Sequence, residues 1–303
     1  MPVSEKMAIA IGGRELHLSN LHKIFYPDSG FTKGQVIDYY CRIAPAMLPH
    51  LKGRPVTLKR YPDGVAGKFF YQKECPSHRP DWLHTSLVQG EKSEREINYC
   101  LLEDLPSLVW AANLAALELH VSLSLGDDPG TPTLLVFDLD PGPPATIIEC
   151  CLVGQALRSL LERLNLQSFP KTSGLKGMQV YVPLNQPVSY DQTKNFAKAC
   201  AQLLEERHPD LVVSRMAKDL RTGKVFIDWS QNDFHKTTVS VYSLRAKDKP
   251  AASAPIMWDE VDAAVKENNP ESLVFEANQV IDRLDRYGDL FAPVAVLKQN
   301  LPL

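Results

Sequence analysis

Long apolar runs are missing from this sequence of 303 residues, and no stretch approaches the roughly 20 apolar residues that cross a membrane. The N-terminus also lacks the basic segment followed by an apolar segment that is typical of a secretory signal. We therefore expect a cytoplasmic protein without a membrane partner. The composition is ordinary for a globular protein, with 44% hydrophobic and 23% charged residues, and it allows one large domain or two modest ones.

Cysteine is scarce and follows no metal-binding pattern. The six cysteines include no CxxC pair, and Cys150 and Cys151 are adjacent in a predicted helix. We expect reduced, buried thiols. Cys75 and His78 could form half of a zinc site, but no second half with suitable spacing follows, so zinc is not expected.

An excess of one charge sign is also missing, because the net charge is only −3. The distribution is nevertheless uneven. Residues 1–75 hold eleven Lys and Arg against six Asp and Glu, a balance of +5, which leaves −8 for the remainder. This asymmetry favours a basic phosphate-holding part beside an acidic metal-holding part, although solvated lysines on any surface would give the same count.

The most informative stretch that is present is TLLVFDLDPG, residues 133–142. Its apolar residues predict a buried strand that delivers Asp138 and Asp140 before Pro141 and Gly142 end it. Side chains alternate along a strand, so both carboxylates point to one face. Two like charges side by side are costly to bury unless a cation neutralises them, and a divalent metal with oxygen ligands suits the pair. Capping of a turn is the structural alternative.

A third carboxylate, Asp228, ends another apolar strand within residues 224–232. Three carboxylates at strand ends can bracket two metal ions about 4 Å apart, which is the arrangement of two-metal phosphoryl transfer. A turn between two strands, residues 171–177, adds a Ser-Gly-x-Lys-Gly pattern. Backbone N–H groups, the Ser173 hydroxyl and the Lys176 ammonium together predict a triphosphate cradle, although the turn is not a Walker motif.

The N-terminal residues predict a place for phosphate. Residues 8–18 predict a hairpin, residues 21–25 a short helix, and Thr32 caps a second helix. Lys23 and Lys33 then lie near helix starts, where unpaired N–H groups suit a phosphate. Ordinary surface lysines are the alternative.

Several basic and aromatic residues lie between positions 54 and 73. Lys59 and Arg60 are neighbours in a predicted strand, so at most one can join a given surface. Phe69, Phe70 and Tyr71 follow, flanked by lysines. Alternation would bury one or two of these rings, and an exposed ring could stack on an unpaired base. Core packing is an equal alternative.

The remaining segments predict further regular elements. We expect a buried helix over 105–120 with His120 near its end, helices from 143 to 166 and over 189–208, and a strand over 237–244 that leads to Arg245. A histidine at such a position is more often structural than catalytic. Residues 248–255 predict a linker, and the tail to residue 303 predicts helices that pack back on the body.

Four motifs carry a resemblance to a known family: FDLDPG at 137–142, TSGLKG at 172–177, IDWSQN at 227–232 and YSLRA at 242–246. They resemble the archaeo-eukaryotic primase superfamily and, more narrowly, the polymerase domain of bacterial DNA ligase D of non-homologous end joining and its stand-alone relatives. The resemblance covers nearly the whole chain. It implies an α/β (α+β) primase-polymerase fold, in which an RRM-like palm with antiparallel and mixed sheets packs against an N-terminal α/β module.

The resemblance also implies boundaries and partners. Residues 1–303 would form one domain, with an N-terminal DNA-phosphate-binding module at 1–115, a catalytic palm at 116–250 and a helical tail at 251–303. It would extend DNA at gaps, nicks or 3′ overhangs that carry a 5′-phosphate, favouring ribonucleotides. A DNA ligase and an end-binding protein such as Ku are the implied partners, at the nucleoid of a bacterial cytoplasm.

Residue roles follow from the same resemblance. Asp138, Asp140 and Asp228 would bind two metal ions, usually Mn²⁺ in this family, or Mg²⁺. The incoming NTP would be held by Ser173, Lys176 and Arg245, with His120 near its sugar and phosphates and with Gln231 and Arg221 at further active-site positions. Lys23, Lys33 and Lys59 would grip the 5′-phosphate of DNA, and Phe69 and Phe70 would stack near template bases.

One position departs from the family pattern. The strand after the cradle usually reads Gly-Leu-His-x-Tyr in the family, whereas Gln179 stands here in place of the histidine. Glutamine can hydrogen-bond a phosphate oxygen but cannot carry charge or donate a proton as an imidazolium does. We therefore expect slower chemistry or altered nucleotide choice. Two other functions remain open: a two-metal nuclease or phosphodiesterase, and a non-catalytic module that bridges DNA ends.

Overall fold

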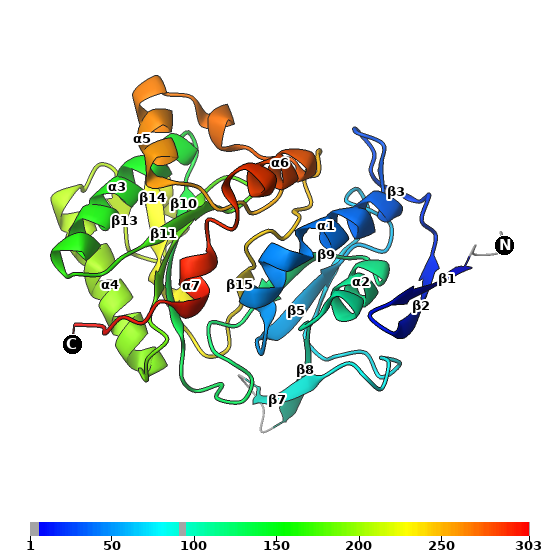
Figure 1. Cartoon of the computed structure of the whole chain (residues 1–303). Helices are drawn as coiled ribbons and strands as arrows, with labels where there is room; N and C mark the ends of the chain where they lie inside the picture. The colour runs from blue at the N-terminus through cyan, green and yellow to red at the C-terminus, as the bar shows by residue number, and fades with distance from the viewer. Residues whose placement is uncertain (1–5, 91–94, 303) are drawn as a thin grey trace.

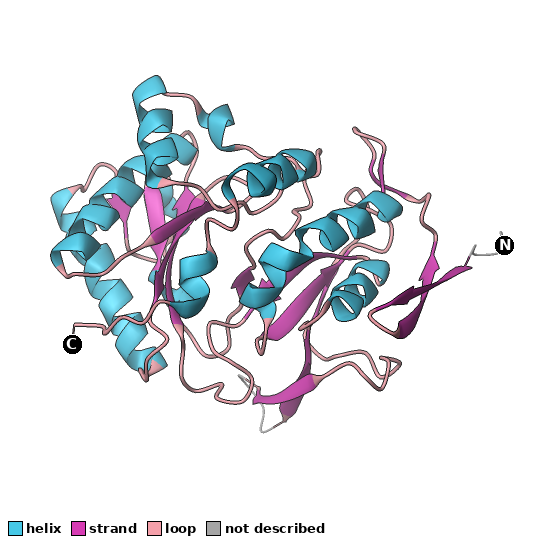
Figure 2. Cartoon of the chain, in the orientation of Figure 1, coloured by secondary structure: helices cyan, strands magenta, loops and turns pink. Residues whose placement is uncertain are grey.

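Two β-sheets organise the computed structural model, which describes residues 6–90 and 95–302 (Figure 1). A five-stranded sheet has the order β11-β12-β10-β14-β13, and a six-stranded sheet has the order β15-β9-β5-β8-β7 with β6 paired to β5. Both halves contain helices and strands (Figure 2). Pairing is antiparallel in the five-stranded sheet except between β13 and β14. The predicted α/β class with antiparallel and mixed sheets is confirmed.

The N-terminal residues form the predicted hairpin, β1 (Lys6–Ile11) and β2 (Arg14–Ser19). The predicted helix over 21–25 is wrong. Residues 24–26 form β3 (Ile24–Tyr26), which pairs with β4 (Phe31–Thr32), because the backbone N–H of Lys33 bonds to the Lys23 carbonyl at 2.8 Å across the two chain segments. Helix α1 (Lys33–Leu51) then begins at the predicted cap, Thr32, whose side chain accepts from the N–H of Gln35.

The six-stranded sheet corrects a second prediction. Residues 105–120 are not one helix, since α2 (Leu105–Asn113) ends before a turn in which Ala115 has φ +61°, and β9 (Ala116–Val121) follows. Pairing of β9 with β5 (Pro55–Arg60) places Glu118 and His120 on a strand. The other strands of this sheet are β6 (Phe70–Gln72), β7 (Thr85–Gln89), β8 (Glu96–Leu101) and β15 (Thr238–Val239).

The five-stranded sheet is centred on β10 (Leu134–Pro141), whose apolar residues are buried as predicted. Helices α3 (Ile147–Arg163) and α4 (Tyr190–Arg207) contact each other and β10, and so cover one face of the sheet. The remaining elements are β11 (Phe169–Thr172), β12 (Met178–Pro183), β13 (Val212–Val213), η1 (Lys218–Arg221), β14 (Val225–Asp228) and η2 (Trp229–Gln231).

The C-terminal tail packs back on the body, as predicted. It contains α5 (Trp258–Glu267), η3 (Pro270–Leu273), α6 (Ala277–Tyr287) and α7 (Ala292–Val296). The red and orange helices α6 and α7 lie beside the blue α1 in Figure 1 and contact it. The predicted linker at 248–255 is wrong: Ala251, Ala252 and Ala254 are buried, and Ala252 bridges to Leu244, because small side chains let this segment fit between the sheet and the tail.

The cysteine prediction is wrong for one pair. Cys75 and Cys100 form a disulfide, since the loop before β7 is held against β8 and the N–H of Cys75 bonds to the Asn98 carbonyl at 2.7 Å. A cysteine in this disulfide is not available for the half-site considered with His78. The other cysteines are free, and Cys150, Cys151 and Cys200 among them are buried as predicted.

The sheet membership bears on how the chain divides. β9 and β15 both belong to the sheet built on β5, although residues 116–121 and 238–239 fall within the range expected for the palm. In the part of the chain that the structure describes, no helix has the length and apolar character needed to span a bilayer.

Candidate functional site

A cleft of about 540 Å³ brings most of the predicted site residues together. Among the described residues, its lining contains eight of them: His120, Asp138, Asp140, Ser173, Lys176, Gln179, Gln231 and Arg245. Tyr71 and Lys247 also line it and were not predicted. Asp228 and Arg221 are not part of this lining, although both act on it electrostatically. The cleft therefore has carboxylates from β10 and cations from the segments facing them.

The carboxylates form the predicted arrangement on adjacent strands. Antiparallel pairing of β10 with β14 places Asp138 directly opposite Asp228, and Asp140 lies two residues further along β10. Burial raises the pKa of Asp138 well above its usual range, and the charges of Asp140 and Asp228 raise it further. Burial and Asp228 also raise the pKa of Asp140. The protein thus leaves this cluster with too little positive charge of its own.

A divalent cation would supply that charge. Asp138 and Asp140 fit it, because they offer hard oxygen ligands and repel each other in its absence. Asp228 is engaged locally: its Oδ1 accepts from the Ser230 N–H at 3.0 Å, and its Oδ2 accepts from Gln231 Nε2 at 3.2 Å. Across residues 6–90 and 95–302, no three His, Cys, Asp or Glu side chains are grouped closely enough for a complete metal site. The Asp228 Oδ2 keeps a further lone pair, so ligation by Asp228 through this oxygen is compatible with these hydrogen bonds.

The predicted cradle is a tight turn fixed to β10. The Ser173 hydroxyl accepts from the N–H groups of Leu175 and Gly177, both at 3.2 Å. Residue 177 must be glycine, because a Cβ there would lie 2.1 Å from the Leu139 carbonyl oxygen. Lys176 is exposed on this turn. The turn therefore presents its ammonium close to the Asp138 and Asp140 end of the strand.

Glu118 is the main site residue that sequence reasoning missed. Its side chain is 1% exposed, and its two oxygens meet Lys59 Nζ at 3.2 Å, Arg245 Nε at 3.3 Å, His120 Nε2 at 3.0 Å and the Tyr61 hydroxyl at 3.2 Å. Burial would raise the pKa of Glu118, but the hydrogen bond with His120 and the charges of Arg245 and Lys59 outweigh it and lower the pKa to about 2. One carboxylate thus holds Lys59, His120 and Arg245 together.

The sequence does contain a pattern that points to Glu118, but the prediction applied the periodicity of a helix where a strand forms. Glu118 and His120 are two positions apart, so a strand places both on one face, whereas the predicted helix separated them. Arg245 extends the cluster, because its NH1 donates to the Ser173 carbonyl at 2.8 Å and so joins Glu118 to the cradle.

A second missed residue is Lys171. It is fully buried, and its Nζ donates to Gln179 Oε1 at 2.6 Å and to Ser253 Oγ at 2.7 Å. Burial lowers the pKa of Lys171 well below its usual range. A hydrogen bond from Gln179 to Asp138 opposes the rise in the pKa of that aspartate. The glutamine that departs from the family pattern therefore connects a buried lysine to the carboxylates.

Arg221 and Gln231 lie beside the carboxylates in different ways. The guanidinium of Arg221 donates to the Met216 carbonyl at 2.8 Å and stacks 3.7 Å from the Phe226 ring centroid, and its charge acts on Asp140. Gln231 lines the cleft and donates to Asp228.

The three lysines predicted to hold a 5′-phosphate do not form one group. Lys33 is buried, and its ammonium donates to the Ser19 carbonyl at 2.6 Å and to Asn113 Oδ1 at 2.8 Å. Burial, with the charges of Lys23 and Arg60, lowers the pKa of Lys33 to about 8. Lys59 instead belongs to the Glu118 cluster. Because neighbours on a strand face opposite ways, Arg60 is the residue of β5 on the side of Lys23 and Lys33.

The aromatic segment is more exposed than predicted. Phe69, Phe70 and Tyr71 are 51%, 44% and 56% exposed, so the expectation that one or two of the rings are buried is wrong. The short strand β6 pairs only with β5 and leaves its rings at the sheet surface. Lys59 Nζ lies 4.4 Å from the Phe69 ring centroid, which connects this surface to the cleft.

Comparisons with known proteins show the family to which this chain belongs. A family model described as "LigD, primase-polymerase domain" matches residues 32–291. The chain is 42% identical over 281 residues to the multifunctional non-homologous end joining protein LigD of Mycolicibacterium smegmatis, and 30% identical over 290 residues to the bifunctional protein LigD of Bacillus subtilis. These matches cover 92% and 95% of this chain but only 36% and 46% of the relatives.

A solved structure is similar over almost its whole length. The polymerase domain of Mycobacterium tuberculosis ligase D, in complex with DNA, superposes with a TM-score of 0.86 at 39% identity, covering 94% of this chain and 99% of that one. The expected fold is confirmed by this similarity. The motifs, the match over residues 32–291 and the fold agree, and the chain belongs to the LigD primase-polymerase domain family.

Proposed function

We propose that the protein adds nucleotides to DNA ends in a template-directed, metal-dependent reaction, with a preference for ribonucleotides. The observation that carries this proposal is the division of charge in the cleft: Asp138 and Asp140 on β10, whose pKa values are raised, line the same cleft as the cations Lys176 and Arg245. A triphosphate with divalent metal complements both sides at once. A nuclease needs no such second group of cations, so the geometry favours synthesis.

The residues in and beside the cleft would have different roles in this reaction. Asp138, Asp140 and Asp228 would hold two Mn²⁺ or Mg²⁺ ions. When bound, these ions supply Lewis-acid stabilisation of the phosphate charge. Ser173, Lys176 and Arg245 would bind and orient the triphosphate, and the pyrophosphate would leave towards these cations. His120 and Gln179 would position the nucleotide, and Gln231 would position Asp228.

The N-terminal part would bind the DNA. Lys23 and Lys33 would contact the 5′-phosphate, and Phe69 and Phe70 would stack on template bases. Lys59 is assigned to the nucleotide side here, because it is paired with Glu118. In a longer protein the partners would be a ligase and an end-binding protein such as Ku, acting at the nucleoid. The boundaries at residues 115 and 250 stay predictions.

Primer extension tests the proposal. We expect incorporation of labelled rNTPs in Mn²⁺ on a gapped duplex, with more product from a 5′-phosphate than from a 5′-hydroxyl. Asp138→Ala should abolish incorporation, whereas Asp128→Ala, in an exposed turn, should not change it. Incorporation that survives Asp138→Ala contradicts the mechanism. Shortening of the primer would favour the nuclease, and binding of DNA without any metal-dependent chemistry would favour the end-bridging module.

A further inference from the structure

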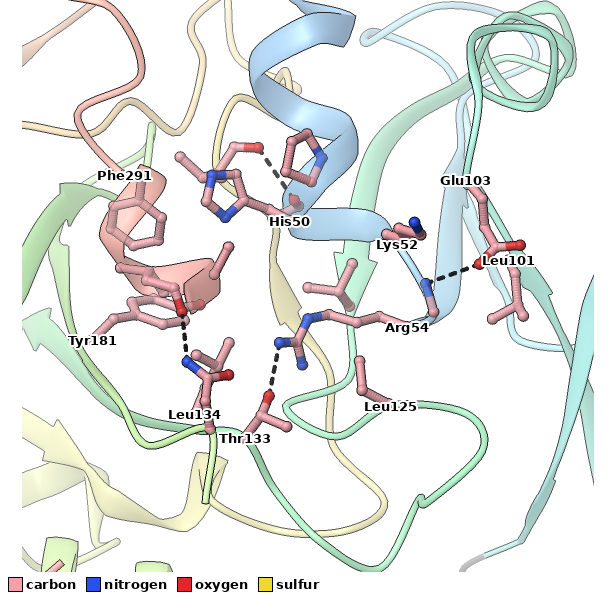
Figure 3. Close-up of a pocket in the computed structure, with 18 of the residues that line it drawn as sticks. His50, Lys52, Arg54, Leu101, Glu103, Leu125, Thr133, Leu134, Tyr181 and Phe291 are labelled. Atoms are coloured by element: carbon pink, nitrogen blue, oxygen red, sulfur yellow. Dashed lines mark hydrogen bonds between the residues drawn. The ribbon is translucent and has the colours of Figure 1, made fainter. Parts of the chain in front are cut away.

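A second cavity, of about 520 Å³, lies between the end of α1, the start of β10 and α7 (Figure 3). Its lining includes His50, Arg54, Leu134, Tyr181 and Phe291. Figure 3 shows the Arg54 side chain extending towards Thr133, with Tyr181 and Phe291 on the opposite side. Both sheets and the C-terminal tail therefore contribute to one pocket, which is open to solvent on one side.

This cavity is distinct from the catalytic cleft. Leu134 and Asp138 are four residues apart on β10, which corresponds to about 13 Å along a strand. Residues 237–239 line the cleft, and Ser240 and Val241 line the cavity, so one segment forms the wall between the two. A ligand of the cavity would not touch the carboxylates.

Arg54 places a positive charge in the wall of the cavity. The residue is 6% exposed, and its guanidinium donates to the Leu123 carbonyl at 2.9 Å and to Thr133 Oγ1 at 2.7 Å. Burial lowers the pKa of Arg54 to about 10, so the group is charged at neutral pH. Among the described residues it has no ion pair with a carboxylate. Its hydrogen bonds are made to neutral acceptors alone.

The other charged residues of the lining are either paired elsewhere or exposed to solvent. His50 pairs with Asp289 at 2.9 Å, and Glu103 accepts from the Gly53 N–H at 3.2 Å. Two side chains of opposite sign are exposed to solvent among the lining residues, Lys52 and Asp127. Charges in water are strongly screened, whereas buried charges are screened much less. Among the described charged residues that line the cavity, Arg54 is therefore the one that is buried without a charged partner.

We propose that this cavity binds a small organic anion, whose carboxylate or phosphate meets Arg54 and whose apolar body packs against Leu134, Tyr181 and Phe291. A guanidinium out of water forms strong, directional hydrogen bonds with such an anionic group. Pockets for small molecules combine apolar walls with a few polar groups in this way. Arg54 contrasts with Arg245, which is equally buried but is already paired with Glu118.

Phenyl phosphate is the probe for this site, titrated calorimetrically into the full chain without metal or nucleotide. We expect saturable 1:1 binding that is at least about tenfold tighter than binding of phenol, which lacks the anion, or of inorganic phosphate, which lacks the apolar body. Equal binding of phenol, or no saturable binding of phenyl phosphate, overturns the proposal.

Two tryptophan variants on α7 locate the bound probe. Ala295 lines the cavity, so Ala295→Trp should fill it and abolish binding, whereas Ala292→Trp, exposed on the same helix, should leave binding unchanged. Lys23→Ala and Lys176→Ala should also leave it unchanged, since they alter the other anion sites. Binding that persists in Ala295→Trp contradicts the assignment. Arg54→Gln should weaken binding at least about tenfold, and the α7 pair decides the question if that variant does not fold.

Discussion

Two carboxylate sites, one on each sheet, show opposite electrostatics. Glu118 on the six-stranded sheet is surrounded by cations of the chain, and its pKa falls to about 2. Asp138 on the five-stranded sheet faces other carboxylates, and its pKa rises well above the usual range. Burial does not explain the difference, since burial by itself raises the pKa of both carboxyl groups. The first carboxylate is neutralised by the fold, and the second needs a cation from outside.

The largest effect is expected from a substitution in the second site, on the five-stranded sheet. Asp138→Asn should lower the rate of nucleotide incorporation by about 10³-fold, because a ligand of the proposed metal is lost. The same change should raise the melting temperature of the metal-free protein, since it removes one of the charges that repel each other. Single-turnover extension and calorimetry measure the two effects. A lower melting temperature for metal-free Asp138→Asn would mean that the site is already neutralised.

The matching change in the first site should have the opposite effect on stability. Glu118→Gln leaves Lys59 and Arg245 buried without their counter-charge, so we expect unfolding free energy to fall by about 3 kcal/mol. The KM for NTP should rise more than kcat falls, because Arg245 loses a positioning contact. Denaturant unfolding and steady-state kinetics are the measurements. Asp128→Asn, in an exposed turn, is the control and should change neither quantity.

The pH dependence of stability sharpens the same comparison. The pKa of Asp138 is raised in the folded state, so between its unfolded value and its folded value the native state binds more protons. Stability of the metal-free protein should therefore increase as pH falls from about 8 to 5. Glu118 has a lowered pKa, and its contribution is lost only as pH falls from about 4.5 to 2. Asp138→Asn should reduce the rise in stability between about pH 8 and 5. If the dependence of stability on pH is unaltered in this variant, other groups cause that rise.

A smaller effect concerns the DNA side. Lys23 is partly exposed and pairs with Asp63 at 2.7 Å, so its ammonium can exchange this partner for a phosphate. Lys23→Ala should weaken binding of 5′-phosphorylated gapped DNA about tenfold and lower the salt slope by about 1, with little change for 5′-hydroxyl DNA. Lys6→Ala, on the first strand, is the control. Fluorescence anisotropy at several salt concentrations measures both affinities. An equal loss of affinity for the 5′-phosphate and the 5′-hydroxyl DNA would exclude a role of Lys23 in 5′-phosphate recognition.

The smallest effect concerns Gln179. Its oxygen accepts from Lys171, so the glutamine orientation is fixed by a buried neighbour. Gln179→His should change kcat, or the ratio of rNTP to dNTP use, by about threefold, the size of one altered hydrogen bond. Parallel extension assays with both nucleotides measure this. Identical kinetics for both proteins would show that the departure from the family pattern has no consequence here.

The sequence was sufficient where one local pattern decided the structure. The alternation around Asp138, the cap at Thr32 and the glycine-rich turn before β12 were all predicted correctly. It was insufficient where a tertiary contact decided. Residues 116–121 have apolar residues that suit a helix, but pairing with β5 makes them a strand and so brings Glu118 to the cleft.

The same reason explains the other corrections. The disulfide of Cys75 and Cys100, and the burial of residues 250–254, depend on segments that meet only in the folded chain. The separation of Lys59 from Lys33 could be deduced in part, because Lys59 and Arg60 cannot share a surface. The pairing of β5 decides whether the side chain of Lys59 or that of Arg60 points towards Lys33.

The contact between Gly177 and Leu139 has a consequence for redesign of the nucleotide site. A methyl group at residue 177 would push the Ser173–Gly177 turn away from the strand that carries Asp138 and Asp140, so the distance between the two halves of the site cannot be tuned there. Leu175 is the tolerant position of the turn, since its side chain is 38% exposed and lines the cleft. Libraries that alter substrate choice should vary Leu175 and leave Gly177 unchanged.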